Sequence, residues 1–394
     1  MTEARTPART CLECGRRLGP AVRSRCPGCG ASLTRQVDFR NSEERLKQDG
    51  PRLIAERRQA GLEGLVGGLR FIVINTEPEH HQTAVEELLL RTGLSVLEGF
   101  EDELAWTIVL RAPGSADVLV TARKGGSPFA AFPGHPKTRS LPATRLETLA
   151  FACRDVVTYA RIQRERGVTF MTEAPVETDA FRFLQTTPSR FTGNSVGLIE
   201  SCGPARSYRT AGATDLDGQL EKPDKDYLTN VGRLDHAATR VRAEERDAAI
   251  LEFITLTNYR FDFAIYVKSL NSITNVARLS AGDFAMVFTS GIAPFVDDTT
   301  SGPTERFIHD YGPRVHHLAW ETSAIDDTFA SLKRDGQAFL LDLVGSPEEG
   351  LKQTFSAMSP HTLLVNEYIH RYGDFDGFFT RSNVTLLTEA TERQ

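Results

Sequence analysis

Long apolar runs are missing from this 394-residue sequence, and cysteine is scarce. No run approaches the roughly 18 apolar residues that a membrane-spanning helix needs, so a membrane protein is not expected. The first ten residues, MTEARTPART, lack the apolar centre of a signal peptide. We therefore expect a cytoplasmic protein. Six cysteines in a chain of this length also do not indicate a disulfide-rich scaffold.

Several widespread catalytic motifs are missing as well. The chain has no P-loop, no GxGxxG after a predicted strand and no GxSxG, so nucleotide-dependent and serine-hydrolase functions lack support. What is present is an ordinary globular composition, with 40% hydrophobic and 25% charged residues. The length is enough for two or three domains.

Four of the six cysteines lie close together near the N-terminus. They are Cys11, Cys14, Cys26 and Cys29. They form two Cys-x2-Cys pairs separated by eleven residues, and each pair is followed by glycine. Two such thiolate pairs can surround one Zn(II) ion tetrahedrally. Four unrelated cysteines would not explain the repeated spacing, so residues 1–40 are predicted to form a zinc ribbon.

The same N-terminal segment is basic. Residues 1–40 hold eight arginines against Glu3, Glu13 and Asp38, a net charge of +5 in a chain whose total is −6. A basic head on an acidic body indicates a macromolecular partner. Because the charge is modest, we expect protein docking or self-association through the zinc ribbon rather than nucleic-acid binding.

After residue 67 a strand, a helix and further strands follow one another four times. The opening strands are predicted in LRFIVIN (69–75), RLETLAFA (145–152), RLDHAATRV (233–241) and RVHHLAWET (314–322). Four such βαβββ units predict an α+β fold with two similar domains. The predicted layout is a zinc ribbon at 1–40, a solvated linker helix at 41–66, a first domain at 67–205, a linker at 206–228 and a second domain at 229–394.

Two histidines hold equivalent positions when the opening strands are aligned. His236 and His317 occupy this position in the third and fourth units, whereas the first two units have Phe71 and Thr148. The last strand of the fourth unit adds Glu367, in LLVNEYI. Two imidazoles and one carboxylate form the facial triad typical of non-haem Fe(II) oxygenases. A single strand histidine is more often structural, but the shared register favours a metal site.

Neighbouring residues need separate interpretation. Side chains alternate along a strand, so only one of His316 and His317 is expected to face the site, and the register favours His317. Glu200 is a candidate for the third position in the first domain. Because one carboxylate cannot hold a catalytic ion, that domain is predicted to be metal-free.

The second half of the chain resembles the vicinal oxygen chelate superfamily, and within it the 4-hydroxyphenylpyruvate dioxygenase group. The segments that carry the resemblance are LDHAATRV (234–241), GPTERFIHDYGPRVHHLAWET (302–322) and HTLLVNEYIHRYGDFDGFFTRSN (361–383). The resemblance implies Fe(II) ligands at His236, His317 and Glu367. It also implies a substrate contact at Gln353 and an aromatic slot shaped by Phe378.

The sequence also departs from that group. FTSGIAP (288–294) replaces an asparagine-containing turn, and Ser382-Asn383-Val384 replaces Gly-Asn-Phe. The segment between His317 and Glu367 is shorter, and a zinc ribbon is not part of the usual layout. Retained ligands with an altered pocket predict a substrate other than 4-hydroxyphenylpyruvate.

The sequence therefore predicts an Fe(II)-dependent dioxygenase that acts with O₂ on a small metal-chelating substrate. The C-terminal tail, DFDGFFTRSN, resembles the 2-oxo acid branch of the family, and this resemblance favours a 2-oxo acid as substrate over a catechol. With a catechol as substrate the protein would be an extradiol dioxygenase. A non-oxidative lyase, isomerase or hydrolase that uses its metal as a Lewis acid is a second possibility. The third is a ligand-binding or regulatory protein that carries a zinc ribbon.

Overall fold

The computed structural model describes residues 42–129, 134–203, 207–216, 220–373, 375 and 377–394, and the backbone of 9–10 and 17–18. All four cysteines of the predicted zinc ribbon lie outside these residues: Cys11, Cys14, Cys26 and Cys29. Two short strands that flank the first cysteine pair are described. These strands, β1 (Arg9–Thr10) and β2 (Arg17–Leu18), pair antiparallel.

The first half of the chain forms a nine-stranded mixed sheet in the order β11-β4-β5-β6-β3-β7-β10-β9-β8. Its strands are β3 (Val66–Asn75), β4 (Ser95–Glu101), β5 (Ala105–Arg111), β6 (Asp117–Arg123), β7 (Arg145–Cys153), β8 (Val176–Glu177), β9 (Phe181–Gln185), β10 (Ser195–Ser201) and β11 (Thr214–Asp215). Helices α2 (His81–Arg91) and α3 (Val156–Glu165) belong to this half.

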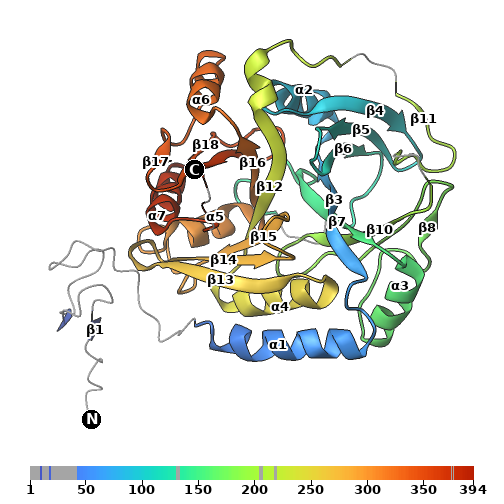
Figure 1. The fold of residues 1–394 in the computed structure, drawn as a ribbon, viewed down its shortest axis with the longest axis horizontal. Coiled ribbons are helices and arrows are strands. Elements are labelled where there is room, and N and C mark those ends of the chain that lie inside the picture. The colour runs from blue at the N-terminus through green and yellow to red at the C-terminus, as the bar shows by residue number, and fades with distance from the viewer. Residues whose placement is uncertain are drawn as a thin grey trace.

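The second half forms an eight-stranded mixed sheet in the order β13-β14-β15-β12-β16-β19-β18-β17. Its strands are β12 (Val231–Arg240), β13 (Arg260–Val267), β14 (Ser272–Arg278), β15 (Ala285–Ser290), β16 (Arg314–Thr322), β17 (Val344–Ser346), β18 (Leu351–Phe355) and β19 (Val365–Arg371). Its helices are α4 (Arg246–Leu256), α5 (Pro303–Tyr311), α6 (Ile325–Arg334) and α7 (Arg381–Ala390). Figure 1 shows two curled sheets side by side, an α+β architecture as expected.

Each of the strands β3, β7, β12 and β16 is followed by a helix and then by three strands. In the fourth run, α5 precedes the opening strand. That these runs are copies of one unit stays a prediction, because β8 and β17 contain only two and three residues.

The two halves share one apolar core. The rings of Phe151 and Phe253, one from each half, lie 5.8 Å apart, and the Tyr159 hydroxyl donates to the Leu256 carbonyl at 2.6 Å. Burial of such large side chains from both halves holds the sheets together. No helix in the described part of the chain is long and apolar enough to cross a membrane.

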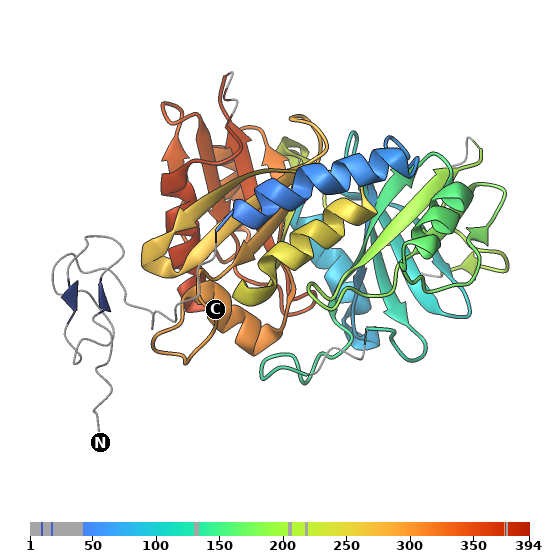
Figure 2. The ribbon, with the colours of Figure 1, turned by 90° about the horizontal axis from the view of Figure 1, so that it is seen from below.

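Helix α1 (Glu44–Gln59) is more than the solvated linker predicted for this segment. It lies alongside α4 and extends along both halves (Figure 2). Its buried Arg57 guanidinium donates to the carbonyls of Ile254, Thr257 and Tyr259 at 3.2, 2.7 and 3.2 Å. These carbonyls lie at the end of α4, where a helix leaves carbonyl groups unpaired, so Arg57 caps α4 from another helix.

The predicted linker at 206–228 contains structured segments. Strand β11 extends the first sheet by pairing with β4, and Arg209 forms an ion pair with Glu98 at 3.2 Å. The Tyr208 hydroxyl donates to Asp117 at 2.6 Å. Residues 207–216 of the connector are therefore packed against the first half, whereas Lys225 and Tyr227 donate to Asp335 of the second half, each at 2.5 Å.

Candidate metal centre

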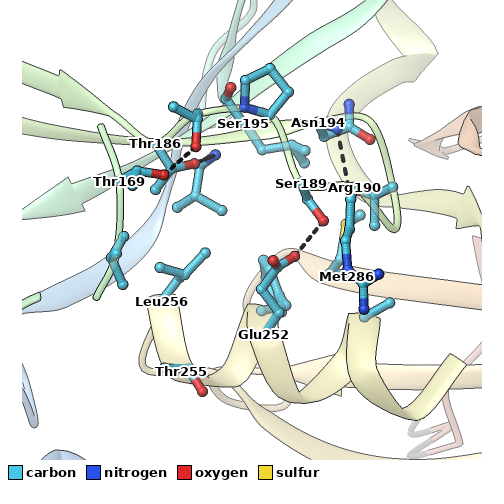
Figure 3. Close-up of a pocket in the computed structure, with 18 of the residues that line it drawn as sticks. Thr169, Thr186, Ser189, Arg190, Asn194, Ser195, Glu252, Thr255, Leu256 and Met286 are labelled. Atoms are coloured by element: carbon cyan, nitrogen blue, oxygen red, sulfur yellow. Dashed lines mark hydrogen bonds between the residues drawn. The ribbon is translucent and has the colours of Figure 1, made fainter. Parts of the chain in front are cut away.

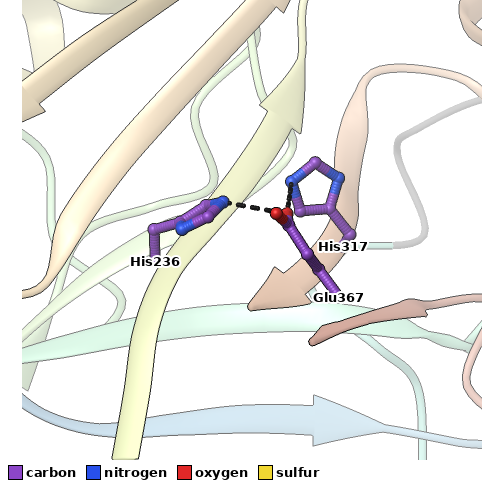
Figure 4. A group of neighbouring side chains, drawn as sticks. All are labelled: His236, His317 and Glu367. Atoms are coloured by element: carbon purple, nitrogen blue, oxygen red, sulfur yellow. Dashed lines mark ion pairs between the residues drawn. The ribbon is translucent and has the colours of Figure 1, made fainter. Parts of the chain in front are cut away.

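His236, His317 and Glu367 come together on three neighbouring strands of the second sheet. They lie on β12, β16 and β19, and Figure 4 shows their side chains converging. The Glu367 Oε2 atom lies 3.2 Å from His236 Nε2 and 3.3 Å from His317 Nε2. All three side chains are buried. Among the described residues, this is the one group of three histidine, cysteine or acidic side chains suited to a metal ion.

The geometry of the three donors fits a divalent cation. Ligand atoms about 2.1 Å from an ion and at right angles to one another are about 3 Å apart, close to the two separations from Glu367, and all three donor atoms lie within 4.8 Å of one another. The buried Nε2 atom of His236 makes no regular hydrogen bond and faces the Glu367 carboxylate at 3.2 Å, a contact that a proton or a metal ion between the two atoms would stabilise. Three protein donors leave coordination positions open for other ligands.

The charges around the site favour a cation. Burial, and then the charges of His316, His236 and Arg240, hold the pKa of His317 well below its usual range, so its imidazole is neutral. Burial also lowers the pKa of His236, but the carboxylates of Glu367 and Asp235 outweigh it and raise that pKa to about 9. Two carboxylates around one imidazole thus stabilise a positive charge at this place.

A β-bulge supports His236. The pairing between β12 and β16 shifts by one residue between Leu234 and His236, so Asp235 is the extra residue. The Asp235 carboxylate lies 2.7 Å from Nδ1 of His236 and accepts two hydrogen bonds from Arg371, at 2.7 and 3.1 Å. Although burial raises the pKa of Asp235, His236 and Arg371 together hold it below its usual range. A carboxylate on the far nitrogen orients Nε2 toward the site.

A second bulge supports His317. The register shifts again at His316, and the two Nδ1 atoms of His316 and His317 lie 2.9 Å apart. Strict alternation predicted that His316 faces away from the site, and this prediction was wrong because the bulge breaks the alternation. His316 Nε2 also lies 2.8 Å from Oε1 of Gln394. If His316 donates to Gln394 and accepts from His317, then Nε2 of His317 keeps its lone pair for a metal.

Glu367 is supported from β18. Gln353 is fully buried, and its amide donates to Glu367 Oε1 at 2.9 Å. The side-chain amide of Asn383, on α7, donates to the side-chain oxygen Oε1 of Gln353 at 3.4 Å. Gln353 was predicted to contact substrate. It lines the cavity described below, but its amide is already engaged with a candidate ligand.

A cavity of about 40 Å³ opens beside His317 and Glu367. Its polar wall consists of Arg240, Ser272, Thr274, Thr289 and Thr304, and its apolar wall includes Val287, Phe355, Phe379, Val384 and Leu387. The last two residues belong to α7, which therefore covers the cavity.

Phe378, predicted to shape an aromatic slot, is buried behind this cavity. Its ring centroid lies 5.4 Å from that of His236, and Arg371 packs over it at 4.8 Å. Phe379 is the member of the pair that lines the cavity, and its ring lies 5.2 Å from His236. Sequence reasoning missed the roles of Asp235, Arg240 and Asn383. The Asp-His dipeptide was the signal available for the first of these.

Within its described residues the first half has no such site, and its third position was wrongly predicted. The strand pairing is equivalent in the two sheets. Phe71 pairs with Ala150 as His236 pairs with Ala319, and Val73 pairs with Thr148 as Ala238 pairs with His317. On the next strand, Gly197 pairs with Ala150 as Glu367 pairs with Ala319. Gly197 rather than Glu200 therefore stands at the third position.

Apolar packing fills the corresponding place in the first half. The ring of Phe71 lies 5.7 Å from Phe183 and 4.9 Å from Tyr208. Glu200 lies elsewhere, bound to Arg182 and to the backbone amide of Val156. The described residues of this half offer no triad of metal donors.

A larger cavity of about 370 Å³ lies between the loop at 186–195 and α4 (Figure 3). Glu252, which lines it, accepts a hydrogen bond from Ser189. The residues that line this cavity are mostly threonine, serine and apolar, with no histidine or cysteine among them. It lacks the donors that a metal centre needs.

The fold has solved counterparts. No protein-family model matches the chain, and no curated protein matches its sequence. A mutant 4-hydroxymandelate synthase from Streptomyces coelicolor matches in structure with a TM-score of 0.63 and 20% identity, over 83% of this chain and 98% of that protein. A xylose isomerase-like TIM barrel/4-hydroxyphenylpyruvate dioxygenase fusion protein matches with a TM-score of 0.56 and 14% identity, over 88% of this chain and 57% of that one. These likenesses show a shared fold.

Proposed function

We propose that this protein is an Fe(II)-dependent dioxygenase whose substrate is a small metal-chelating molecule, most simply a 2-oxo acid. The observation that carries the proposal is the convergence of His236, His317 and Glu367 from three neighbouring strands, with every donor buried. Two imidazole nitrogen donors and one carboxylate are the ligand set of non-haem Fe(II) oxygenases, and a bound metal ion would take the place of the proton on His236.

The chain supplies the iron site and its surroundings. When bound, a ferrous ion would offer open positions to a chelating substrate and O₂, and electrons for oxygen activation. His236, His317 and Glu367 would hold it, while Asp235, His316 and Gln353 orient those three side chains. The apolar residues of α7 over the cavity would exclude water from the reaction.

The comparisons support the reaction class only through the fold. The two solved counterparts are named as a 4-hydroxymandelate synthase and a 4-hydroxyphenylpyruvate dioxygenase fusion. The polar wall of the present cavity, with Arg240 and several hydroxyl groups, offers partners for a second polar group of a substrate, and FTSGIAP (288–294) and Ser382-Asn383-Val384 depart from the pattern of the 4-hydroxyphenylpyruvate dioxygenase group. We therefore propose a substrate other than 4-hydroxyphenylpyruvate.

The N-terminal segment is proposed to be a separate Zn(II)-binding module. Cys11, Cys14, Cys26 and Cys29 would hold the ion, and the basic surface of the segment would bind a protein partner or a second copy of the chain. Its role would be docking, apart from the oxygen chemistry.

The function is tested by oxygen uptake. Anaerobically purified protein is loaded with Fe(II) and mixed with a panel of 2-oxo acids and catechols in an oxygen-electrode chamber. One CO₂ released for each O₂ consumed would support the 2-oxo acid reaction, and ring cleavage without CO₂ would indicate a catechol substrate. Turnover under strict anaerobiosis with Zn(II) or Mn(II) would contradict the oxygenase proposal and favour Lewis-acid chemistry.

A further inference from the structure

Arg240 is a buried charge on the wall of the candidate active site. It is 4% exposed and lies on β12, four residues after His236. Residues i and i+4 of a strand point to the same face. Both histidines of β16 line the same cavity as Arg240, and its charge lowers the pKa of each.

No acidic side chain in the described part of the chain pairs with Arg240. Its guanidinium makes one long hydrogen bond, 3.5 Å to the Pro303 carbonyl, and packs 4.4 Å from the ring of Phe307. Arg371, in contrast, is bound through two nitrogens to Asp235. A buried guanidinium without a carboxylate is unfavourable. Burial is the one cause acting on the pKa of Arg240, and lowers it to about 9.

Several hydroxyl groups line the same cavity as Arg240. Thr274 and Thr289 are opposite each other on β14 and β15, and Ser272 and Thr304 are 3.2 Å apart. Hydroxyl groups can donate hydrogen bonds to an anion without bringing a competing negative charge. The cavity therefore has a positive, donor-rich wall in addition to the candidate metal ligands His317 and Glu367.

We propose that Arg240 binds a second acidic group of the substrate, so that the site takes a dicarboxylic 2-oxo acid in preference to a monocarboxylic or aryl 2-oxo acid. One end of such a molecule would be the 2-oxo carboxylate that chelates the metal. The other carboxylate would meet the guanidinium, whose planar fork matches carboxylate geometry. This inference rests on the proposed function for the chelating end, and on Arg240 alone for the distal end.

A purely structural role for Arg240 makes a different prediction. If the guanidinium served only to join β12 to Pro303 and Phe307, its removal would lower stability and leave ligand selectivity unchanged. If the Arg240 guanidinium instead binds substrate, its removal from the substrate-free protein eliminates a buried charge that has no partner. The thermal midpoint would then stay the same or rise, while selectivity is lost.

The test measures binding without turnover. Under anaerobic conditions, Fe(II)-loaded wild type and the variant Arg240→Gln are titrated calorimetrically with 2-oxoglutarate and with the monoacid 2-oxobutyrate. Glutarate, which lacks the 2-oxo group, is titrated into the metal-free proteins. We expect Arg240→Gln to weaken the binding of 2-oxoglutarate and of glutarate roughly ten- to a hundredfold, which is the effect of losing one charged hydrogen bond. The affinity for 2-oxobutyrate should not change.

Arg242→Gln is the matched control, because it removes the same charge from a residue that is ion-paired with Glu245 at 3.1 Å. Arg240→Lys keeps the positive charge but not the planar guanidinium, and should recover part of the preference for the diacid. This second variant keeps the test usable if Arg240→Gln misfolds. Equal affinity of wild type for diacid and monoacid, or unchanged diacid binding in Arg240→Gln, would overturn the inference. If glutarate binding depends on Arg240 but no oxygen uptake is found, the role of Arg240 in diacid binding would be supported and the proposed dioxygenase function would be contradicted.

Discussion

The Nδ1 atoms of His316 and His317 lie 2.9 Å apart, although the two residues are neighbours on one strand. In a regular strand their side chains would point to opposite faces. The bulge at His316 turns both toward the cavity, so that one imidazole is a candidate ligand and the other holds it.

From this relationship we predict that His316→Ala weakens metal retention without removing a ligand. Loss of such a supporting residue typically lowers metal affinity ten- to a hundredfold. Metal content after dialysis against a graded chelator series would measure the change. His309→Ala is the control, because its half-exposed ring stacks on Phe295 away from the triad. Equal retention in wild type and His316→Ala would show that the contact does not support the site.

Gln353→Leu should reduce metal affinity as well as substrate affinity. Sequence reasoning alone predicts that the metal is kept, because Gln353 is expected to contact substrate only. Its 2.9 Å hydrogen bond to Glu367 changes this expectation, since a candidate ligand would lose a partner in a buried place. Competition for Fe(II) with a coloured chelator would measure the effect, and the exposed Gln82→Leu is the control. If Gln353→Leu bound Fe(II) as tightly as wild type and only its KM were raised, Gln353 would be a substrate contact alone, as the sequence predicts.

The sequence pattern was sufficient to find the three residues that converge. His236 and His317 were found by aligning the opening strands RLDHAAT and RVHHLAW, and Glu367 as the carboxylate of the last strand of the fourth unit. The two bulges were not predictable, since an extra residue at Asp235 or His316 leaves no mark in the pattern of apolar residues. The supporting contacts of both residues depend on those bulges.

Two other misses have physical causes in tertiary packing. Glu200 was predicted because it is the carboxylate of its strand, whereas the residue that pairs with Ala150 is decided by the register of β10 against β7 and is Gly197. A side chain at Gly197 would lie 2.9 Å from Phe183, so the packing requires glycine. Arg57 lies among charged residues of α1, so the sequence predicts that it is exposed to solvent. Its guanidinium is buried because the backbone carbonyls that accept its hydrogen bonds are about 200 positions away in the sequence.

Arg57→Met should destabilise the whole chain by about 3 kcal/mol, as expected when a buried charged group with several acceptors is removed. The carbonyls of Ile254 and Thr257 and the carboxylate of Glu63 would lose their donor. Urea unfolding monitored by circular dichroism would measure the loss. The neighbouring Arg58 is exposed, so Arg58→Met should change stability by less than about 0.5 kcal/mol. Similar midpoints for the two variants would contradict the capping role.

The zinc prediction is tested in the full chain. If residues 11–29 bind one Zn(II), elemental analysis should find about one zinc per chain in wild type and much less in Cys14→Ser and Cys29→Ser, because a structural site needs all four thiolates. Iron content should not change. Cys202→Ser is the control, since Cys202 is a free, exposed thiol. Equal zinc in all four proteins would exclude this site.

His236→Ala, His317→Ala and Glu367→Ala should each abolish iron retention and oxygen uptake while leaving the fold intact, because each removes one of three candidate ligands from a site that no other described residue completes. A readout independent of turnover is the thermal midpoint with and without added Fe(II). An ion at about 100 times its Kd stabilises the native state by about 2.7 kcal/mol, which raises the midpoint of wild type by several degrees.

The three variants should show no such rise, whereas His370→Ala, on the same strand as Glu367, should respond to Fe(II) as wild type does. His370 is a fair control because its Nδ1 contacts the Thr322 carbonyl at 2.7 Å, away from the triad. If one of the three alanine variants kept the full midpoint rise, that residue would not be a ligand. The ion would then be held elsewhere, and the dioxygenase proposal would lose the observation that carries it.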